Sequence, residues 1–182
     1  MYNAVMSQRI FNELMNGRII NKTVIDNSNS FTENSLFTEI IDNLGDYRNQ
    51  YKMSGYEFVE NPDYIYIREL TADKSSLKSD ITMKACVLLL LMGKYLTENN
   101  YRISKLIEPS GGLTEADFEA IQHMPDTAEI LEKSAMKRDF NASIKPILVE
   151  RNIMLQKIGS NAFILSDSGR AFFDEIVDSY QS

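Results

Sequence analysis

The sequence has very few of the residues on which enzymatic chemistry usually depends. Its 182 residues include one cysteine, Cys86, one histidine, His123, and no tryptophan. A single cysteine cannot form a disulfide within the chain, and Cys86 lies in an apolar run that suits a small buried side chain. A nucleophilic Cys–His pair would have to open that core. Clustered Cys or His at metal-binding spacing and glycine-rich phosphate loops are also missing. We therefore expect a protein with no enzymatic activity and no cofactor.

Long apolar runs are missing as well. Residues 85–92 are all apolar, but a membrane-spanning helix needs about 20 such residues, and a lysine flanks this run closely on each side. The N-terminal residues lack the apolar segment of a signal peptide. We therefore expect a cytoplasmic protein whose core is built around one buried helix at residues 80–97. Ser79 or Asp80 would serve as the N-cap of that helix.

The chain has no excess of positive charge. Its formal net charge is −7 and its pI is about 4.8, whereas a protein that binds nucleic acid by itself usually has a basic face. The charges are nevertheless segregated, since residues 108–132 contain seven acidic and no basic residues and residues 133–157 contain six basic and two acidic ones. The candidate DNA contacts in the basic segment are Lys137, Arg138, Lys145, Arg151 and Lys157. The alternative is a solvated helix face that pairs with the acidic segment before it.

The first half of the chain is predicted to contain helices followed by a β-hairpin. Apolar spacing predicts helices at residues 3–16 and 31–52, and alternation around the turn at residues 60–63 predicts the hairpin. The second helix is acidic, so this half is better suited to protein than to DNA. The candidate protein-interface residues are the hairpin tyrosines Tyr56, Tyr64 and Tyr66. Alternating aromatic residues on a strand are also typical of a core.

The second half repeats this order. The apolar helix is followed by a helix capped by Thr114, by a helix at residues 134–152 that Pro146 should kink or divide, by a second hairpin at 153–165 and by a closing helix. We predict a mostly α-helical protein with small β-hairpins (α+β), built as tandem winged-helix domains at residues 1–72 and 73–182. The alternative is an α+β protein of another topology.

Four segments carry a resemblance to a known family. They are NGRIINKTVIDN, LFTEIIDNLGDYRNQYKMSGYEFVENPDYIYIRE, VLLLLMGKYL and SNAFILSDSGRAFF. Together with the order of elements, they resemble the MukE/MksE family over about residues 5–178. The MksE branch fits better, because no long acidic tail follows in this sequence.

The resemblance implies a non-catalytic accessory subunit, of the kind called a kite protein, in a bacterial condensin-like SMC complex. Such a subunit forms a homodimer, binds a kleisin (MukF/MksF-like) and through it joins an SMC ATPase (MukB/MksB-like). DNA is contacted within the complex, in a nucleoid-associated machine. Related complexes organise chromosomes or act with a nuclease partner in plasmid defence. The family has no catalytic residues to transfer to this chain.

A second function remains open, that of a winged-helix transcription regulator that binds DNA alone as a dimer. It predicts that the purified protein binds DNA with a steep salt dependence. The net charge of −7 argues against it.

Overall fold

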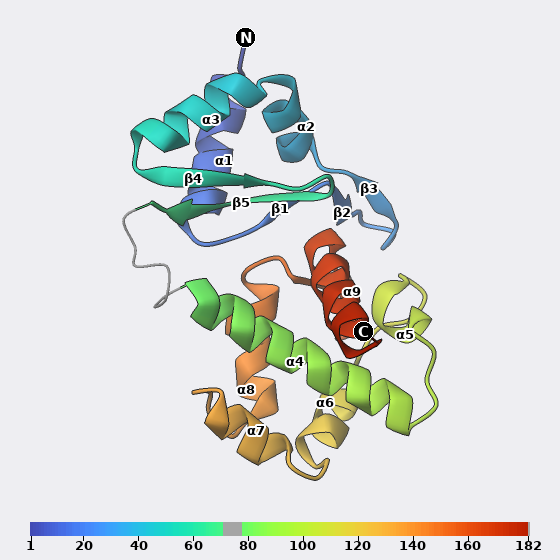
Figure 1. The fold of residues 1–182 in the computed structure, drawn as a ribbon. Helices are drawn as coiled ribbons and strands as arrows, with labels where there is room; N and C mark the ends of the chain where they lie inside the picture. Colours follow the sequence, from blue (N-terminus) through green and yellow to red (C-terminus); the bar gives the residue numbers. More distant parts are fainter. Residues whose placement is uncertain (71–77, 182) are drawn as a thin grey trace.

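The chain folds into two lobes that lie one above the other (Figure 1). The computed structural model describes residues 1–70, the first lobe, and residues 78–181, the second lobe. The chain is about 53% helical with small antiparallel sheets, which confirms the predicted α+β class. The predicted domain boundary at residues 72 and 73 lies outside the described residues. Among the described helices, none is long and apolar enough to span a membrane.

The first lobe places three helices on one face of a small sheet (Figure 1). In chain order its elements are α1 (Ala4–Met15), β1 (Ile20–Asn21), β2 (Thr23–Ile25), β3 (Phe31–Glu33), α2 (Ser35–Asp42), α3 (Leu44–Met53), β4 (Tyr56–Glu60) and β5 (Tyr64–Glu69). The predicted hairpin is present as β4 and β5, to which β1 adds a third strand, and β2 pairs with β3. The first predicted helix is present as α1, capped by the Asn3 side chain and ended by Gly17, whose φ is +74°.

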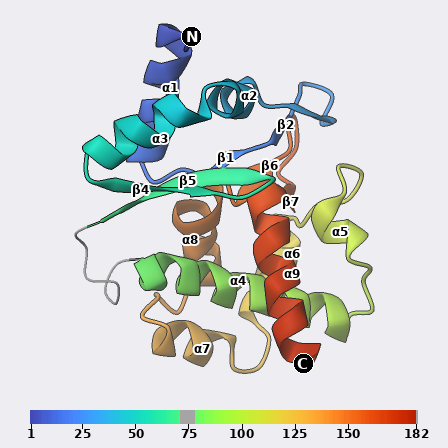
Figure 2. The ribbon, with the colours of Figure 1, turned by 45° about the horizontal axis from the view of Figure 1, so that its top comes forward.

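The sheet of the first lobe contributes side chains to two hydrophobic cores. Ile20 and Ile65 are buried among the helices of the first lobe, whereas their sequence neighbours Ile19 and Tyr64 are buried in the core of the second lobe. This follows from the alternation of side chains along a strand, which sends successive residues to opposite faces. Figure 2 shows the sheet between the helices α1–α3 and the second lobe. The second lobe therefore covers the face of the sheet that the first lobe leaves open.

The second lobe is organised around the long helix α4. Its elements are α4 (Lys78–Glu98), α5 (Ser104–Ile107), α6 (Glu115–Gln122), α7 (Thr127–Lys133), α8 (Phe140–Ile144), η1 (Lys145–Val149), β6 (Met154–Gln156), β7 (Phe163–Leu165) and α9 (Asp167–Gln181). The prediction of a buried apolar helix is confirmed, since Leu88, Leu89 and Met92 are fully buried. The predicted N-cap is wrong, because α4 begins before Ser79 and Asp80.

The predicted single helix at residues 31–52 is wrong in two ways. Its first residues form the strand β3, and the remainder is broken at Asn43 into α2 and α3. The Asn43 side chain donates to the Glu39 carbonyl, a local bond that competes with continuation of the helix. Asn34 caps α2 by accepting from the Leu36 N–H. The break was hidden from sequence analysis because buried residues keep helical spacing on both sides of it.

The predicted helix at residues 134–152 begins later and changes pitch at its proline. Ala135 has a φ of +58° directly after α7, and α8 begins only at Phe140. Pro146 then lies in η1, a π-helical turn in which the Glu150 N–H bonds to the Lys145 carbonyl five residues earlier. Proline has no N–H to donate and clashes with a regular turn, so a wider turn accommodates it. The predicted division of the helix is therefore a π-turn continuous with α8.

A buried polar contact joins the two lobes. Asn21, only 3% exposed, donates to the Asn152 carbonyl at 2.8 Å and accepts from the Ser168 N–H at 2.8 Å. Asp167, at the start of α9, accepts from both the N–H and the hydroxyl of Thr23 at 2.7 and 2.8 Å. We call this contact the seam. Because these bonds cross between the lobes in both directions, they fix how the lobes are oriented.

Candidate functional site

The five basic candidates occupy one stretch of the chain but several structural settings. Lys137 and Arg138 lie between α7 and α8, Lys145 begins η1, Arg151 follows η1, and Lys157 lies in the loop between β6 and β7. The first three are exposed and the last two are half-buried. Within the described residues, neither Lys137 nor Lys145 forms an ion pair. Of the five candidates, these two are both exposed and without an ion pair among the described residues.

The acidic segment neutralises part of the basic one. Arg138 forms an ion pair with Glu132 at 2.6 Å, and the neighbouring Lys133 pairs with Glu129 at 2.6 Å. The hydrogen bond from Lys133 holds the pKa of Glu129 below its usual value, and the same bond raises the pKa of Lys133. These contacts match the alternative interpretation of the sequence, in which the basic face pairs with its acidic neighbour.

Arg151 is engaged between the lobes. Its guanidinium donates to the Gly17 carbonyl at 3.2 Å, and its own carbonyl accepts from the Ile19 N–H at 3.0 Å. Both partners belong to the first lobe. In this position Arg151 ties the end of α1 to the end of η1.

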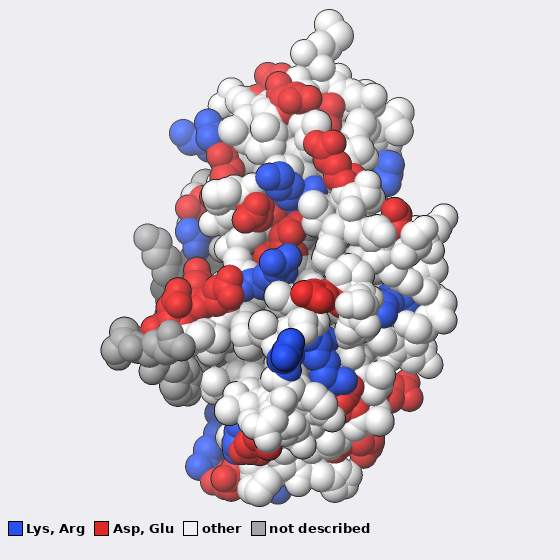
Figure 3. Space-filling view, turned by 90° about the vertical axis from the view of Figure 1, so that its right-hand side faces the viewer, with Lys and Arg blue, Asp and Glu red and all other residues white. Residues whose placement is uncertain are grey.

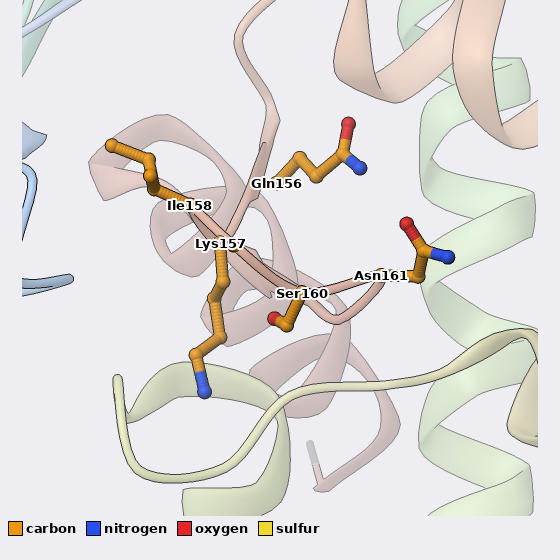
Figure 4. A pocket seen from close by; sticks show the side chains of 6 residues that line it. Gln156, Lys157, Ile158, Ser160 and Asn161 are labelled. Atoms are coloured by element: carbon orange, nitrogen blue, oxygen red, sulfur yellow. The ribbon is translucent and has the colours of Figure 1, made fainter.

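Lys157 is folded back onto its own lobe. Its ammonium donates to the Gly111 carbonyl at 3.1 Å. Figure 4 shows Lys157 pointing toward the segment after α5, while Ile158 points away from it. The backbone of Ile158 exchanges two hydrogen bonds with the side-chain amide of Asn29 in the first lobe, at 2.6 and 3.0 Å. The loop of the second hairpin is thus held from two sides, beside an open hollow of about 520 Å³.

The three tyrosine candidates lie mainly in internal contacts. Tyr64 is 7% exposed and packs edge-on against Phe172 of α9, with ring centroids 5.6 Å apart. Burial raises the pKa of Tyr64 to about 12. Tyr66 stacks on Tyr64 at 6.3 Å and is half-buried, and Tyr56 is half-buried against the core of the first lobe. Tyr64 and Tyr66 therefore join the two lobes, whereas Tyr56 packs within the first lobe. All three leave only part of their surface for a partner.

A buried polar network joins α4 and the residues after it to the start of α6. Tyr95 of α4 donates to Asp117 at 2.6 Å, and Lys105 lies 3.3 Å from the same carboxylate. Thr114 and Asp117 form a capping box at the start of α6, as predicted for Thr114. Burial alone would raise the pKa of Asp117, but hydrogen bonds from Tyr95 and Thr114 outweigh it and lower the pKa. All the groups that donate to the Asp117 carboxylate belong to neighbouring elements of the same lobe. We therefore assign this network the role of holding α6 in position.

The two residues that could support nucleophilic chemistry lie in unsuitable settings. His123 ends α6 with a side chain that is 77% exposed, and its ring nitrogen contacts the Glu119 carbonyl at 2.8 Å. Cys86 is half-buried in α4, where burial raises the pKa of its thiol and so disfavours the reactive thiolate. Within the described residues there is no group of three side chains able to hold a metal ion.

The residues with the most consequential contacts were not identified from the sequence. Asn21, Asn29 and Asn152 each join the two lobes, and Asn29 and Asn152 do so at φ values of +57° and +62°. Asparagine adopts such left-handed conformations more readily than most residues. The one available signal is the density of asparagine around the short β segments.

Comparison with known proteins gives one clear result. The family model for condensin complex protein MksE matches residues 6–177, which is most of each lobe and the segment between them. No curated protein matches the chain with significance. Since the family model covers nearly the whole chain, this protein belongs to the MksE family of condensin complex proteins.

Proposed function

We propose that this chain is a non-catalytic accessory subunit of a bacterial condensin-like SMC complex, in which it binds the kleisin subunit. The family match over residues 6–177 carries the proposal. The exposed His123 and the half-buried Cys86 support a role without catalysis. Through the kleisin the subunit would join the SMC ATPase and act on DNA, in chromosome organisation and segregation or, with a nuclease partner, in plasmid defence. Its place would be the cytoplasm, at the nucleoid.

We further propose that the two lobes are winged-helix domains, divided as residues 1–72 and 73–182. In each lobe several helices are followed by an antiparallel hairpin, β4–β5 in the first and β6–β7 in the second, where α9 comes after it. This order supports the proposal. The shared core around Tyr64 and the seam mean that the two domains would act as one rigid unit.

DNA contacts would be made within the assembly. Lys137 and Lys145 are the exposed candidates for phosphate contacts, and Arg138 would have to exchange its bond with Glu132. Arg151 and Lys157 would have to leave their bonds to Gly17 and Gly111. The net charge of −7 argues against DNA binding by the free subunit.

Two measurements on the full chain test the proposal. Size-exclusion chromatography with mass measurement should give a homodimer, and a pull-down from the host should recover a kleisin and a large coiled-coil ATPase by mass spectrometry. Recovery of neither partner, together with a dimer that shifts DNA unaided, would contradict the proposal. That outcome would favour the stand-alone transcription regulator.

A further inference from the structure

The first lobe has a groove between α2 and the turn of its hairpin. It encloses about 630 Å³, within the range of protein binding sites, and Phe37, Ile41 and Pro62 form its apolar lining. Phe37 is only 7% exposed, whereas Ile41 is 46% exposed although it belongs to the same helix. A single exposed isoleucine is ordinary on a protein surface. Here it stands in a concave wall beside an exposed proline, which is an arrangement suited to an apolar side chain.

A second hollow, of about 310 Å³, adjoins the groove on the side toward α1. Glu33, Thr38 and Asp42 line both the groove and this hollow, and we call them the ridge. A chain that crosses the ridge can therefore place side chains on both sides of α2. An extended peptide, whose successive side chains point to opposite sides, suits a site with two adjoining hollows.

The rim of the groove is acidic. Glu33 and Asp42 form no ion pair within the described residues, and the one cation of the lining is Lys22. Glu60, also in the lining, is already paired with Arg48. Over the whole first lobe, acidic residues outnumber basic ones by ten to six. Figure 3 faces the side that carries α2 and the hairpin turn, and shows acidic side chains over the first lobe with basic ones among them.

We propose that this groove binds an extended segment of the partner subunit in which an apolar side chain lies next to a lysine or arginine. The apolar side chain would fill the space between Phe37, Ile41 and Pro62. The neighbouring cation would meet Glu33 and Asp42, and the Asn61 amide could bond the peptide backbone. DNA does not fit this surface, because its phosphates would face the same carboxylates. The inference rests on the proposed function, since it places the kleisin contact on this groove.

Two groove variants test the site, each with a matched control in the same lobe. Ile41→Glu introduces a charge into the apolar wall, and its control is Met53→Glu, at a residue that is 87% exposed outside the groove. The double variant Glu33→Lys/Asp42→Lys reverses the charge of the rim, and its control is Asp46→Lys on α3. Thermal unfolding of each variant shows that the fold is intact. The binding assay is calorimetry or a pull-down of the full chain with its full-length kleisin partner.

We expect both groove variants to weaken the complex by about tenfold or more and both controls to leave it unchanged. Added salt should weaken wild-type binding more than binding of the double variant. A wild-type complex that is unaffected by both groove variants would overturn the inference and leave the proposed function standing. A wild-type chain that binds no kleisin would overturn the proposed function itself. If Ile41→Glu instead turns a free dimer into a monomer, the groove belongs to a second copy of this chain and the inference is wrong.

Discussion

The two hairpins of this molecule share a pattern but differ in what surrounds their loops. The turn of the first hairpin, at residues 61–63, lines an open groove. The loop of the second hairpin is held by Asn29 of the first lobe and by the bond from Lys157 to Gly111. The first hairpin is thus free to contact a partner at its turn, whereas the loop of the second is engaged in internal contacts.

The two hairpins also differ in how they are supported. The first hairpin faces its own helices with one side of β5 and the second lobe with the other. The second hairpin has only three residues in each strand, and its support comes from outside, through the seam and the bridge between Leu113 and Phe163. A short hairpin alone is marginally stable in water. Its dependence on the first lobe predicts that damage to either lobe is felt by the other.

The largest effect should come from the core that both lobes share. Leu89 of α4 is fully buried in the cluster that also contains Ile19 and Tyr64 of the first lobe. Leu89→Asp should destabilise the protein by roughly 4 kcal/mol or more, because an unpaired charge would be buried. We expect that urea unfolding of this variant, monitored by circular dichroism, is no longer cooperative.

The same helix offers two graded controls. Met83→Asp, at a residue that is 55% exposed, should leave the unfolding midpoint nearly unchanged, and Leu90→Asp, at a half-buried residue, should fall between the two. An unchanged midpoint for Leu89→Asp would show that the two lobes do not depend on this core.

The next largest effect should come from the seam. Asn21→Leu removes both side-chain bonds. It leaves the Ser168 N–H buried without its acceptor and the Asn152 carbonyl with the bond from the Ser168 hydroxyl, at 3.3 Å. A buried group left unmet costs about 1–3 kcal/mol, so we expect a loss of roughly 1–3 kcal/mol. Hydrogen exchange at the Ser168 amide should accelerate. Asn12→Leu, on the exposed face of α1, is the matched control and should change neither quantity. Unchanged exchange at Ser168 would mean that the seam does not hold the lobes together.

The sequence predicts more of the fold than of the contacts between its parts. The central helix and both hairpins follow from local patterns, because apolar runs and turn residues act within a few positions. The break at Asn43 and the π-turn at Pro146 do not, since a side-chain bond and a wider turn leave the spacing of buried residues nearly intact. The seam joins Asn21 to Asn152, which are distant in the sequence, and nothing local marks either residue as a partner.

The candidate site was also predictable only in part, because its contacts join residues that are distant in the sequence. Charge segregation identified the basic segment, but a count of charges along the chain does not show that Arg151 and Lys157 turn inward. The groove escaped sequence analysis because it combines residues from α2 with residues from the hairpin turn. Its best signal, the exposed Ile41, looks like a core residue in the helical pattern.

A smaller effect should separate two glycines of the first lobe. Gly17 has a φ of +74°, and an added Cβ would lie 2.7 Å from the Arg151 guanidinium, whereas Gly45 in α3 has open space around it. Gly17→Ala should destabilise by about 1–2 kcal/mol, and Gly45→Ala should stabilise by about 0.5–1 kcal/mol because alanine favours a helix. Urea unfolding measures both. If Gly17→Ala behaved like Gly45→Ala, the end of α1 would not be constrained by the second lobe.

The smallest effects should distinguish the bonds at the two hairpins by their pH dependence. Arg48 pairs with Glu60, and its hydrogen bond lowers the pKa of Glu60 from 4.5. That contribution is complete above pH 4.5 and is lost as the pH falls through the lowered pKa. Because the pair is exposed, Arg48→Met should destabilise the protein only slightly at pH 7 and progressively less in acid. Lys157 instead donates to a carbonyl that does not titrate, so Lys157→Met should cost about 1 kcal/mol throughout this pH range.

Urea titrations of both variants from pH 7 downward, as far as the proteins stay folded, give the comparison. Equal pH dependence in the two variants would show that the loop of the second hairpin is held by charge as well, and that the contrast between the hairpins is smaller than their contacts indicate.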